Sequence, residues 1–283
     1  MAGSRWIRRL RFLMAGLVLG GLLLSLLTLC EGWVERTFIF FPTGALLATP
    51  LQVGLEFQDC FFPTTDGLTL HGWYIPGPRD APVLLWCHGN GGNLSYELEN
   101  LALVHRAGLG VFIFDYRGYG LSQGRPSEAG VYADAAAAYA YLTGELKTPP
   151  ARVALFGRSL GAAVAADLAG RVPALALVLE AGFTNVGDMA RQHYFWLPGR
   201  NLYAHKFDAA ARLAQVTMPK LIIHGDQDYI VPLWMGQKLY DLAPPPKEFC
   251  RIAGAGHNDI LEVAGREYLA RLTQFLGSLK SDQ

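Results

Sequence analysis

The segment that decides the fold of this chain reads RVALFGRSLGAAVAADLA, residues 152–169. Its beginning, 153–156, is an apolar run typical of a buried strand, and its end, 162–169, is typical of a helix. Between them lies Gly157-Arg158-Ser159-Leu160-Gly161. Only glycine tolerates the close backbone approach that a sharp turn from strand to helix demands. We therefore expect a tight turn that projects the Ser159 hydroxyl from the end of a sheet, although a glycine-rich turn of this kind can also be purely structural.

Strand-like and helix-like segments alternate through most of the chain. We predict strands at 56–62, 69–75, 83–87, 110–114, 153–156, 175–179, 220–223 and 248–252, of which the first two form a hairpin. We predict helices at 94–107, 127–142, 160–169, 233–242 and 264–279. Such alternation is typical of a parallel sheet covered by helices on both faces. The predicted fold is α/β, a doubly wound, mostly parallel eight-stranded sheet in one domain at 50–283.

One segment, 183–213, interrupts this alternation and carries several aromatic residues, among them Phe183, Tyr194, Phe195, Trp196 and Tyr203. It follows the C-terminal end of a predicted strand, where open sheets of this class bind ligands. Two interpretations stay open. The segment is either a short lid that supplies an apolar pocket wall or an ordinary connector whose aromatic side chains pack on the domain.

The N-terminal region has the pattern of a membrane anchor. A basic segment, 1–11, contains four arginines and precedes an uncharged apolar run at 12–30. As a helix, this run would span about 28 Å, close to the thickness of a bilayer core. No small-x-small cleavage site follows it, which favours an uncleaved transmembrane helix over a signal peptide. The arginines would stay cytoplasmic, so a juxtamembrane linker at 31–49 and the domain would lie on the extracytoplasmic side.

Composition excludes several classes of protein. Among the 283 residues, 51% are hydrophobic and 17% are charged, as in a globular protein with a substantial core. A formal net charge of zero argues against a nucleic-acid partner. The four cysteines show no metal-ligand spacing, and a disulfide between Cys60 and Cys250 is conceivable but not favoured. We expect neither a metal nor an organic cofactor.

A serine hydroxyl becomes a nucleophile only when a base takes its proton and an acid orients that base. Of the seven histidines, His257 lies in the loop 254–259, directly after the last predicted strand. The loop 224–232 follows another strand and offers two acids, Asp226 and Asp228. Asp226 can cap its own turn, whereas Asp228 lies deeper in the loop, so we favour Asp228 as the acid.

Acyl transfer also needs donors that face a developing oxyanion. The backbone N–H of Leu160, directly after the serine, is one candidate. The second is the N–H of Asn90, in the glycine-rich loop His88-Gly89-Asn90-Gly91-Gly92-Asn93. As a phosphate-binding loop this stretch fails, because no Lys-Ser/Thr pair follows it and it lacks the dinucleotide spacing.

Together these motifs resemble the α/β-hydrolase superfamily. The resemblance rests on the serine turn, the loop 88–93, the motifs Asp115-Tyr116-Arg117-Gly118-Tyr119-Gly120 and Gly256-His257, and the pattern His224-Gly225-x-x-Asp228-x-x-Val231-Pro232. The order serine, aspartate, histidine is that of the superfamily. The match looks closest to the branch that includes membrane-anchored protein depalmitoylases, lysophospholipase-like lipases and relatives of serine aminopeptidases.

The resemblance implies a role for each motif residue. Ser159 would be the nucleophile, His257 the base and Asp228 the acid, with Asn90 and Leu160 as oxyanion donors. The 115–120 motif would shape a loop beside the site through a structural aspartate–arginine pairing. One departure concerns the anchor. Animal depalmitoylases are lipidated on N-terminal cysteines, whereas the first cysteine here is Cys30.

We therefore expect a membrane-anchored serine hydrolase that cleaves carboxylic esters or thioesters, with acyl-chain substrates drawn from the bilayer. Two alternatives stay open. A serine aminopeptidase would need an acid for the free amine of a peptide, and the 183–213 segment offers Asp188 and Asp208. A non-catalytic, membrane-tethered scaffold is the other alternative, because a fold alone does not establish a function.

Overall fold

The computed structural model describes Met14, residues 35–194 and residues 205–279 of the chain. The chain divides into two compact units, Met1–Phe41 and Pro42–Gln283. In the first, the described residues include a short π-helix (η1, Glu35–Ile39). The expected basic segment 1–11 and anchor 12–30 lie outside the described residues, apart from Met14. None of the helices that the structure describes is long and apolar enough to cross a bilayer.

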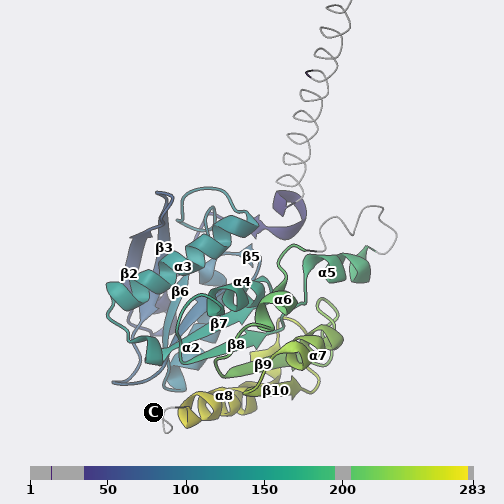
Figure 1. Ribbon diagram of the computed structural model, residues 1–283. Coiled ribbons are helices and arrows are strands. Elements are labelled where there is room, and N and C mark those ends of the chain that lie inside the picture. Colours follow the sequence, from purple (N-terminus) through teal and green to yellow (C-terminus); the bar gives the residue numbers. More distant parts are fainter. Residues whose placement is uncertain (1–13, 15–34, 195–204, 280–283) are drawn as a thin grey trace, which may run out of the picture. The chain divides into compact units, whose positions relative to one another are not determined.

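An eight-stranded sheet forms the centre of the second unit (Figure 1). Its strands are β2 (Gln58–Pro63), β3 (Thr69–Ile75), β4 (Val83–Cys87), β6 (Gly110–Phe114), β7 (Val153–Arg158), β8 (Ala176–Glu180), β9 (Lys220–Gly225) and β10 (Lys247–Ile252). Their order is β10-β9-β8-β7-β4-β6-β3-β2. β3 pairs antiparallel with both β2 and β6, and the other neighbours are parallel. The prediction of a mostly parallel eight-stranded sheet is confirmed.

The order of the strands by itself indicates where a ligand would bind. β4 lies between β6 and β7, so the chain winds outward from β4 in both directions. In open α/β sheets, ligands bind at the carboxyl ends of the strands where the winding reverses. The loop 88–93 follows β4 and Ser159 follows β7, so both lie at this reversal.

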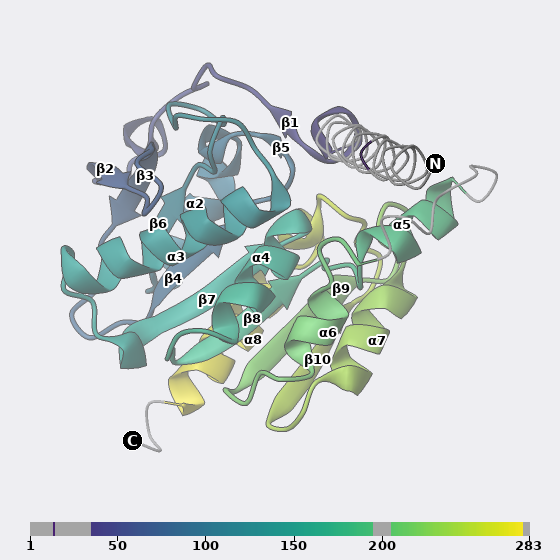
Figure 2. The same ribbon diagram turned by 45° about the horizontal axis from the view of Figure 1, so that its top comes forward.

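Helices cover both faces of the sheet (Figure 2). They are α2 (Leu98–Arg106), α3 (Glu128–Gly144), α4 (Leu160–Ala169), α5 (Val186–His193), α6 (Ala209–Leu213), α7 (Leu233–Leu242) and α8 (Ile260–Ser278). α3, α4, α6 and α7 pack in a row on one face, whereas α2 and α8 lie together on the other. α4 and α7 coincide with the predicted helices 160–169 and 233–242.

Shorter elements complete the unit. The 3-10 helices are η2 (Pro50–Val53), η3 (Leu94–Glu97) and η4 (Pro150–Arg152), so the predicted helix 94–107 is in fact η3 followed by α2. Two minimal strands, β1 (Phe41–Pro42) and β5 (Gly91–Gly92), were not predicted. The 183–213 segment contains α5 and α6, and its residues 195–204 lie outside the described part of the chain.

The central strands are buried on both faces, as a parallel sheet requires. Every residue of β4, β6 and β8 is buried, whereas exposed and buried side chains mix along the edge strand β2. Cys60 in β2 and Cys250 in β10 stand on the two opposite edge strands. Cys60 and Cys250 therefore form no disulfide with each other, and both thiols are free.

Candidate active site

Ser159 occupies a strained turn between β7 and α4. Its φ of 54° and ψ of −116° lie outside the regions that a residue with a side chain prefers, at a cost of about 1–3 kcal/mol. The Ser159 N–H donates to the Glu180 carbonyl of β8 at 2.9 Å, which attaches the turn to the sheet. Strain of this kind persists only where the surroundings impose it.

Two glycines make this turn possible. A methyl group on Gly157 would lie 2.2 Å from the Gly161 carbonyl oxygen, and one on Gly161 would lie 2.0 Å from that of Cys87. Both distances are far below van der Waals contact, so neither position accepts a side chain. The first turn of α4 consequently packs directly on the ends of β7 and β4. The predicted tight turn is present, and its contact with β4 was not predicted.

The three predicted side chains meet at the carboxyl edge of the sheet. His257 Nε2 lies 2.9 Å from Ser159 Oγ, and His257 Nδ1 lies 2.7 Å from Asp228 Oδ2. Asp228 accepts at Nδ1, so the neutral ring carries its proton there and presents the Nε2 lone pair to the serine O–H. The other Asp228 oxygen accepts from the N–H groups of Ile230 at 2.9 Å and Val231 at 2.7 Å. Asp228 is thus held from both sides.

Asp226, the alternative acid, has other partners. Its Oδ2 accepts from Arg251 at 2.8 Å and its Oδ1 from the Gly254 N–H at 2.8 Å. These donors lower the pKa of Asp226 below its ordinary value. Asp226 therefore links the end of β9 to the loop that carries His257, whereas Asp228 contacts His257 itself.

Two further histidines support the acid loop. His224 Nε2, buried at the end of β9, donates to the Val231 carbonyl at 2.7 Å, and burial lowers the pKa of His224. His193 Nε2, at the end of α5, donates to the Ile230 carbonyl at 2.7 Å. Neither ring reaches Ser159 by a hydrogen bond. Among the described residues, the histidine that does so is His257.

The loop 88–93 borders Ser159. A methyl group added to Gly89 would lie 3.8 Å from Ser159 Cβ, which is ordinary van der Waals contact. The carbonyl oxygen of His88 would lie 2.7 Å from a methyl group on Gly161. The peptide that carries the Asn90 N–H and the helix start that carries the Leu160 N–H are therefore both next to the serine.

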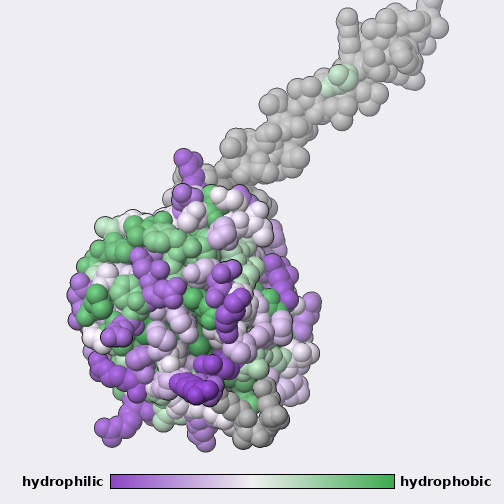
Figure 3. Space-filling view, turned by 90° about the vertical axis from the view of Figure 1, so that its left-hand side faces the viewer, coloured by the Kyte–Doolittle hydropathy of each residue, from purple (hydrophilic) through white to green (hydrophobic). Residues whose placement is uncertain are grey.

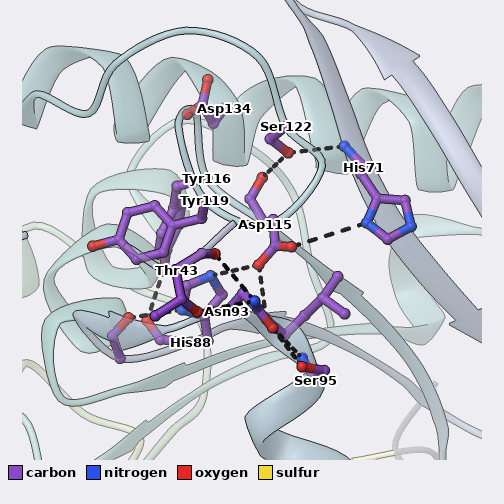
Figure 4. Close-up of polar contacts among 12 residues, drawn as sticks. Thr43, His71, His88, Asn93, Ser95, Asp115, Tyr116, Tyr119, Ser122 and Asp134 are labelled. Atoms are coloured by element: carbon purple, nitrogen blue, oxygen red, sulfur yellow. Dashed lines mark hydrogen bonds and ion pairs between the residues drawn. The ribbon is translucent and has the colours of Figure 1, made fainter. Parts of the chain in front are cut away.

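Side chains from the 115–120 loop hold the backbone of the 88–93 loop (Figure 4). Tyr116 donates its hydroxyl to the His88 carbonyl at 2.9 Å, and Tyr119 donates to the Asn90 carbonyl at 2.7 Å. Asp115 Oδ1 accepts from the Leu94 N–H at 2.7 Å. Three backbone groups within seven residues are thereby fixed.

Asp115 is fully buried between two histidines. Its carboxylate oxygens lie 3.9 Å from His71 Nδ1 and 3.5 Å from His88 Nε2. Burial would raise the pKa of Asp115, but these rings and the Leu94 N–H lower it below the ordinary value. The loop is therefore held by an ionised, solvent-excluded carboxylate.

The pairing implied within the 115–120 motif is different in the structure. Arg117 does not pair with Asp115. It binds Asp134 of α3 at 2.8 Å and Asp66 of the β2–β3 turn at 2.8 Å. Arg117 therefore ties the loop to α3 and to the β2–β3 turn, and Asp115 holds the 88–93 loop.

Residues expected as a linker also hold the 88–93 loop. The Asn93 side chain donates to the carbonyls of Ala45 at 2.8 Å and Thr43 at 3.1 Å. The Thr43 N–H donates to the Gly92 carbonyl at 2.9 Å, and the Leu47 N–H donates to Ser95 Oγ at 2.9 Å. The segment from Thr43 to Leu47 is thus part of the domain, directly behind the candidate oxyanion loop.

A polar network next to the site was not predicted. Arg158 binds Glu97 of η3 and Glu180 of β8, and Tyr268 of α8 donates to Glu180. One signal in the sequence was available, since Arg158 and Glu180 each interrupt an otherwise apolar run. Nothing in the sequence shows that these residues meet.

Comparison with known proteins agrees with this architecture. Residues 82–218 match the family model described as alpha/beta hydrolase fold. An uncharacterized protein of Mycobacterium tuberculosis is 41% identical over 86% of this chain and 87% of its own length. The alpha/beta hydrolase domain-containing protein WAV2 of Arabidopsis thaliana is 31% identical over 91% of this chain and 92% of its own length.

Among solved structures, an esterase from Pyrococcus furiosus superposes with a TM-score of 0.72 at 21% identity, over 85% of this chain and 98% of the esterase. At that identity the likeness concerns the fold alone. The sequence relatives, the family match and the strained serine turn between β7 and α4 agree with one another. The chain belongs to the α/β-hydrolase superfamily.

Proposed function

We propose that this protein is a serine hydrolase that cleaves carboxylic esters or thioesters through an acyl-enzyme. The observation that carries the proposal is the continuous chain of hydrogen bonds from Ser159 Oγ through His257 to Asp228, at 2.9 and 2.7 Å. His257 Nε2 takes the serine proton as Oγ attacks the substrate carbonyl. The backbone N–H groups of Asn90 and Leu160 stabilise the oxyanion. His257 then protonates the leaving group, and water releases the acid.

A fluorophosphonate probe tests this proposal directly, because it phosphonylates only a serine that a base activates. We expect the wild-type chain to be labelled and Ser159→Ala to remain unlabelled. Ser278→Ala is a matched control, since Ser278 lies at the end of α8 and bonds its own helix. Equal labelling of wild type and Ser159→Ala would reject the proposed nucleophile. Absence of labelling in folded wild type would favour the scaffold alternative.

The aminopeptidase alternative is not favoured, because both candidate acids are already engaged. Asp188 is hydrogen-bonded to Thr184 and paired with Arg191 and Lys238. Asp208 accepts from the Ala211 N–H at 2.9 Å and caps α6. Asp188 is therefore already neutralised by two cations, and Asp208 already serves as a helix cap. Aminoacyl p-nitroanilides test this point, and turnover that exceeds that of p-nitrophenyl esters would reverse our preference.

We further propose that the substrate carries an acyl chain and that the protein acts at a membrane, anchored by residues 12–30 with its domain on the extracytoplasmic side. Exposed apolar side chains support this, with Leu47 and Leu51 each 65% exposed and Phe61 53% exposed. Figure 3 shows one face on which hydrophobic side chains gather over the upper part.

Two measurements test this extension. With p-nitrophenol as a fixed leaving group, kcat/KM should rise from acetate to longer acyl esters, and matched thioesters should show the same order. Flat or falling values would count against an acyl-chain substrate. Protease added to intact cells should digest the domain, whereas protection until the membrane is opened would reverse the proposed orientation.

A further inference from the structure

Arg158 stands directly before Ser159, and its side chain reaches three separate elements. Nη1 lies 3.0 Å from Glu97 Oε2 and Nε lies 3.2 Å from Glu180 Oε1. Nη2 donates to the Asn258 carbonyl at 3.3 Å and faces the His257 carbonyl at 3.5 Å. The guanidinium thus connects the residue before the nucleophile to the backbone of the loop that carries the base.

The two glutamates around Arg158 are themselves held. Tyr268 donates to Glu180 Oε2 at 2.6 Å, and Asn100 donates to Glu97 Oε2 at 2.7 Å. Side-chain exposure is 12% for Arg158, 11% for Glu97 and 3% for Glu180. The planar guanidinium is therefore fixed in one orientation, which aims Nη2 at the base loop.

Stability alone does not account for such a cluster. Burial raises the pKa of Glu180, so its ionised form is held at a cost. Buried ion clusters often add little to stability compared with apolar side chains of equal volume, because each charge loses its hydration. The cluster does fix the direction in which Arg158 donates its hydrogen bonds, since a guanidinium carries five N–H donors in a rigid plane.

The His257 loop needs an external support of this kind. Residues 254–259 contain two glycines, and the φ of Gly254 is 79°. Within the loop the Gly256 N–H donates to Asp259 Oδ1 at 2.6 Å. From outside, the Gln227 N–H donates to the Ala255 carbonyl at 2.9 Å and Asp226 accepts from the Gly254 N–H at 2.8 Å, so these contacts hold residues 254–256. Asp228 fixes the ring of His257 at Nδ1 but leaves the backbone at 257–258 to other partners.

We propose that Arg158 is a positioning residue that holds the His257 backbone at the distance from Ser159 that proton transfer requires. This inference rests on the proposed function, in which His257 is the base. Arg158 touches no reacting atom. It acts through the carbonyls of residues 257 and 258. Because Arg158 is the chain neighbour of Ser159, these hydrogen bonds connect the backbone beside the nucleophile to the backbone of the base.

The test is Arg158→Lys, which keeps the charge beside Glu97 and Glu180 but cannot serve both acids and the base loop from one ammonium. A displacement of about 1 Å in a catalytic group can cost roughly 100-fold in rate. We expect the fluorophosphonate labelling rate and the kcat for p-nitrophenyl acetate to fall by roughly 10- to 100-fold, with KM little changed.

Arg152→Lys is a matched control at the opposite end of the same strand. Arg152 precedes β7, and its guanidinium donates to the Ala81 carbonyl at 2.8 and 3.0 Å, remote from the site. We expect this variant to keep kcat within about two-fold at a comparable thermal midpoint. Equal losses of kcat in the two lysine variants, or a loss that follows the thermal midpoint, would overturn the positioning role.

Chemical rescue separates positioning from bulk stability. In Arg158→Ala, free guanidinium at a non-denaturing concentration should occupy the vacated space and restore part of the labelling rate, whereas ethylammonium should not. No response to guanidinium would count against the proposal. Should the position 158 variants fail to fold, Glu97→Gln provides a second variant, which removes one ion pair at constant volume and should lower kcat by a smaller factor. An unchanged kcat in Glu97→Gln would then reject the proposal.

A readout without turnover keeps this inference distinguishable from the proposed function. The Nδ1 proton between His257 and Asp228 should give a downfield proton resonance, assigned by its loss in His257→Gln. We expect this resonance to broaden or shift in Arg158→Lys and to remain in Arg152→Lys. A changed resonance in a protein that no probe labels would support the positioning role while rejecting hydrolysis, and an unchanged resonance would reject the positioning role.

Discussion

Ser159 Oγ and His257 Nε2 lie 2.9 Å apart, but the turn that carries the serine and the loop that carries the histidine are held in place by different contacts. The turn is fixed by backbone packing, since Gly157 and Gly161 leave no room for even a methyl group. The base loop also packs closely, since a methyl group on Gly225 would lie 2.3 Å from the Ala255 carbonyl oxygen. It is held in addition by side chains from elsewhere, namely Asp226 on the Gly254 N–H and Arg158 on the Asn258 carbonyl. The residues that make the turn therefore stand within five positions of one another, whereas the side chains that hold the base loop lie up to 100 residues from it.

Among the substitutions considered, Gly161→Ala should disrupt the tightly packed Ser159 turn the most. The new methyl group would lie 2.0 Å from the Cys87 carbonyl oxygen, a backbone atom that cannot move away alone. We expect a loss of about 3 kcal/mol of stability or more, or roughly 6–12 °C in Tm, together with loss of probe labelling. Calorimetry and labelling of the same sample measure both.

Gly170→Ala, at the other end of α4, is the control. An added methyl group there would meet its nearest neighbour, the Asp167 carbonyl oxygen, at 3.6 Å, and the backbone is right-handed helical. We expect unchanged labelling and a stability within about 1 kcal/mol of wild type. A Gly161→Ala variant as stable and as active as Gly170→Ala would show that packing does not fix the turn.

The same difference explains what could be predicted from the sequence. Five elements coincide with predicted segments, because each is a continuous stretch of residues typical of its kind of element: β3, β4, β6, α4 and α7. The serine turn is equally local, since its glycines and its nucleophile are neighbours in the chain. By contrast, α5 and α6 are short and lie in an irregular insertion, so their periodicity was too brief to recognise.

The side-chain contacts that hold the site in place could not be predicted from the sequence, for a physical reason. Arg158, Glu97 and Glu180 come from β7, η3 and β8, and only the folded sheet brings their charges together. The pairing of Arg117 with Asp134 and Asp66, and not with Asp115, has the same origin. A motif identifies which residue types are present, but their partners depend on the register of distant elements.

On the side held by side chains, the largest effect should come from Asp228→Asn. The Asn side-chain oxygen can still accept from the Ile230 and Val231 N–H groups, so the loop should stay folded. Its amide would face His257 Nδ1 as a donor, which moves the ring proton to Nε2 and removes the acceptor for the serine. We expect kcat/KM to fall by roughly 1,000- to 10,000-fold with little change in Tm.

Asp226→Asn is the matched control for that measurement, because it changes the other carboxylate of the same loop. We expect kcat/KM for p-nitrophenyl acetate to change by less than about ten-fold, since Asp226 contacts Gly254 and Arg251 and not the imidazole. If Asp226→Asn were the more damaging substitution, the assignment of the acid would be reversed.

Tyr119→Phe extends the comparison to the oxyanion loop and removes one neutral hydrogen bond among the several that hold it. The variant removes the hydroxyl that donates to the Asn90 carbonyl at 2.7 Å and keeps the ring. A hydrogen bond of this kind is worth about 1 kcal/mol, so kcat/KM should fall by no more than about five-fold. Tyr139→Phe, which loses a similar bond to the Pro173 carbonyl away from the site, should leave kcat/KM unchanged. Equal losses in both would indicate general loosening of the fold.

The smallest effect is a pH dependence confined to the base loop. Arg251 and the Gly254 N–H lower the pKa of Asp226, so the folded state favours its ionised form. This contribution to stability is complete above the ordinary carboxyl pKa of 3.8 and is lost as pH falls through the lowered folded value. The difference in urea midpoint between wild type and Asp226→Asn should therefore be constant near neutral pH and shrink below that value. A difference that persists unchanged into acid would mean that the charge of Asp226 is not what stabilises the loop.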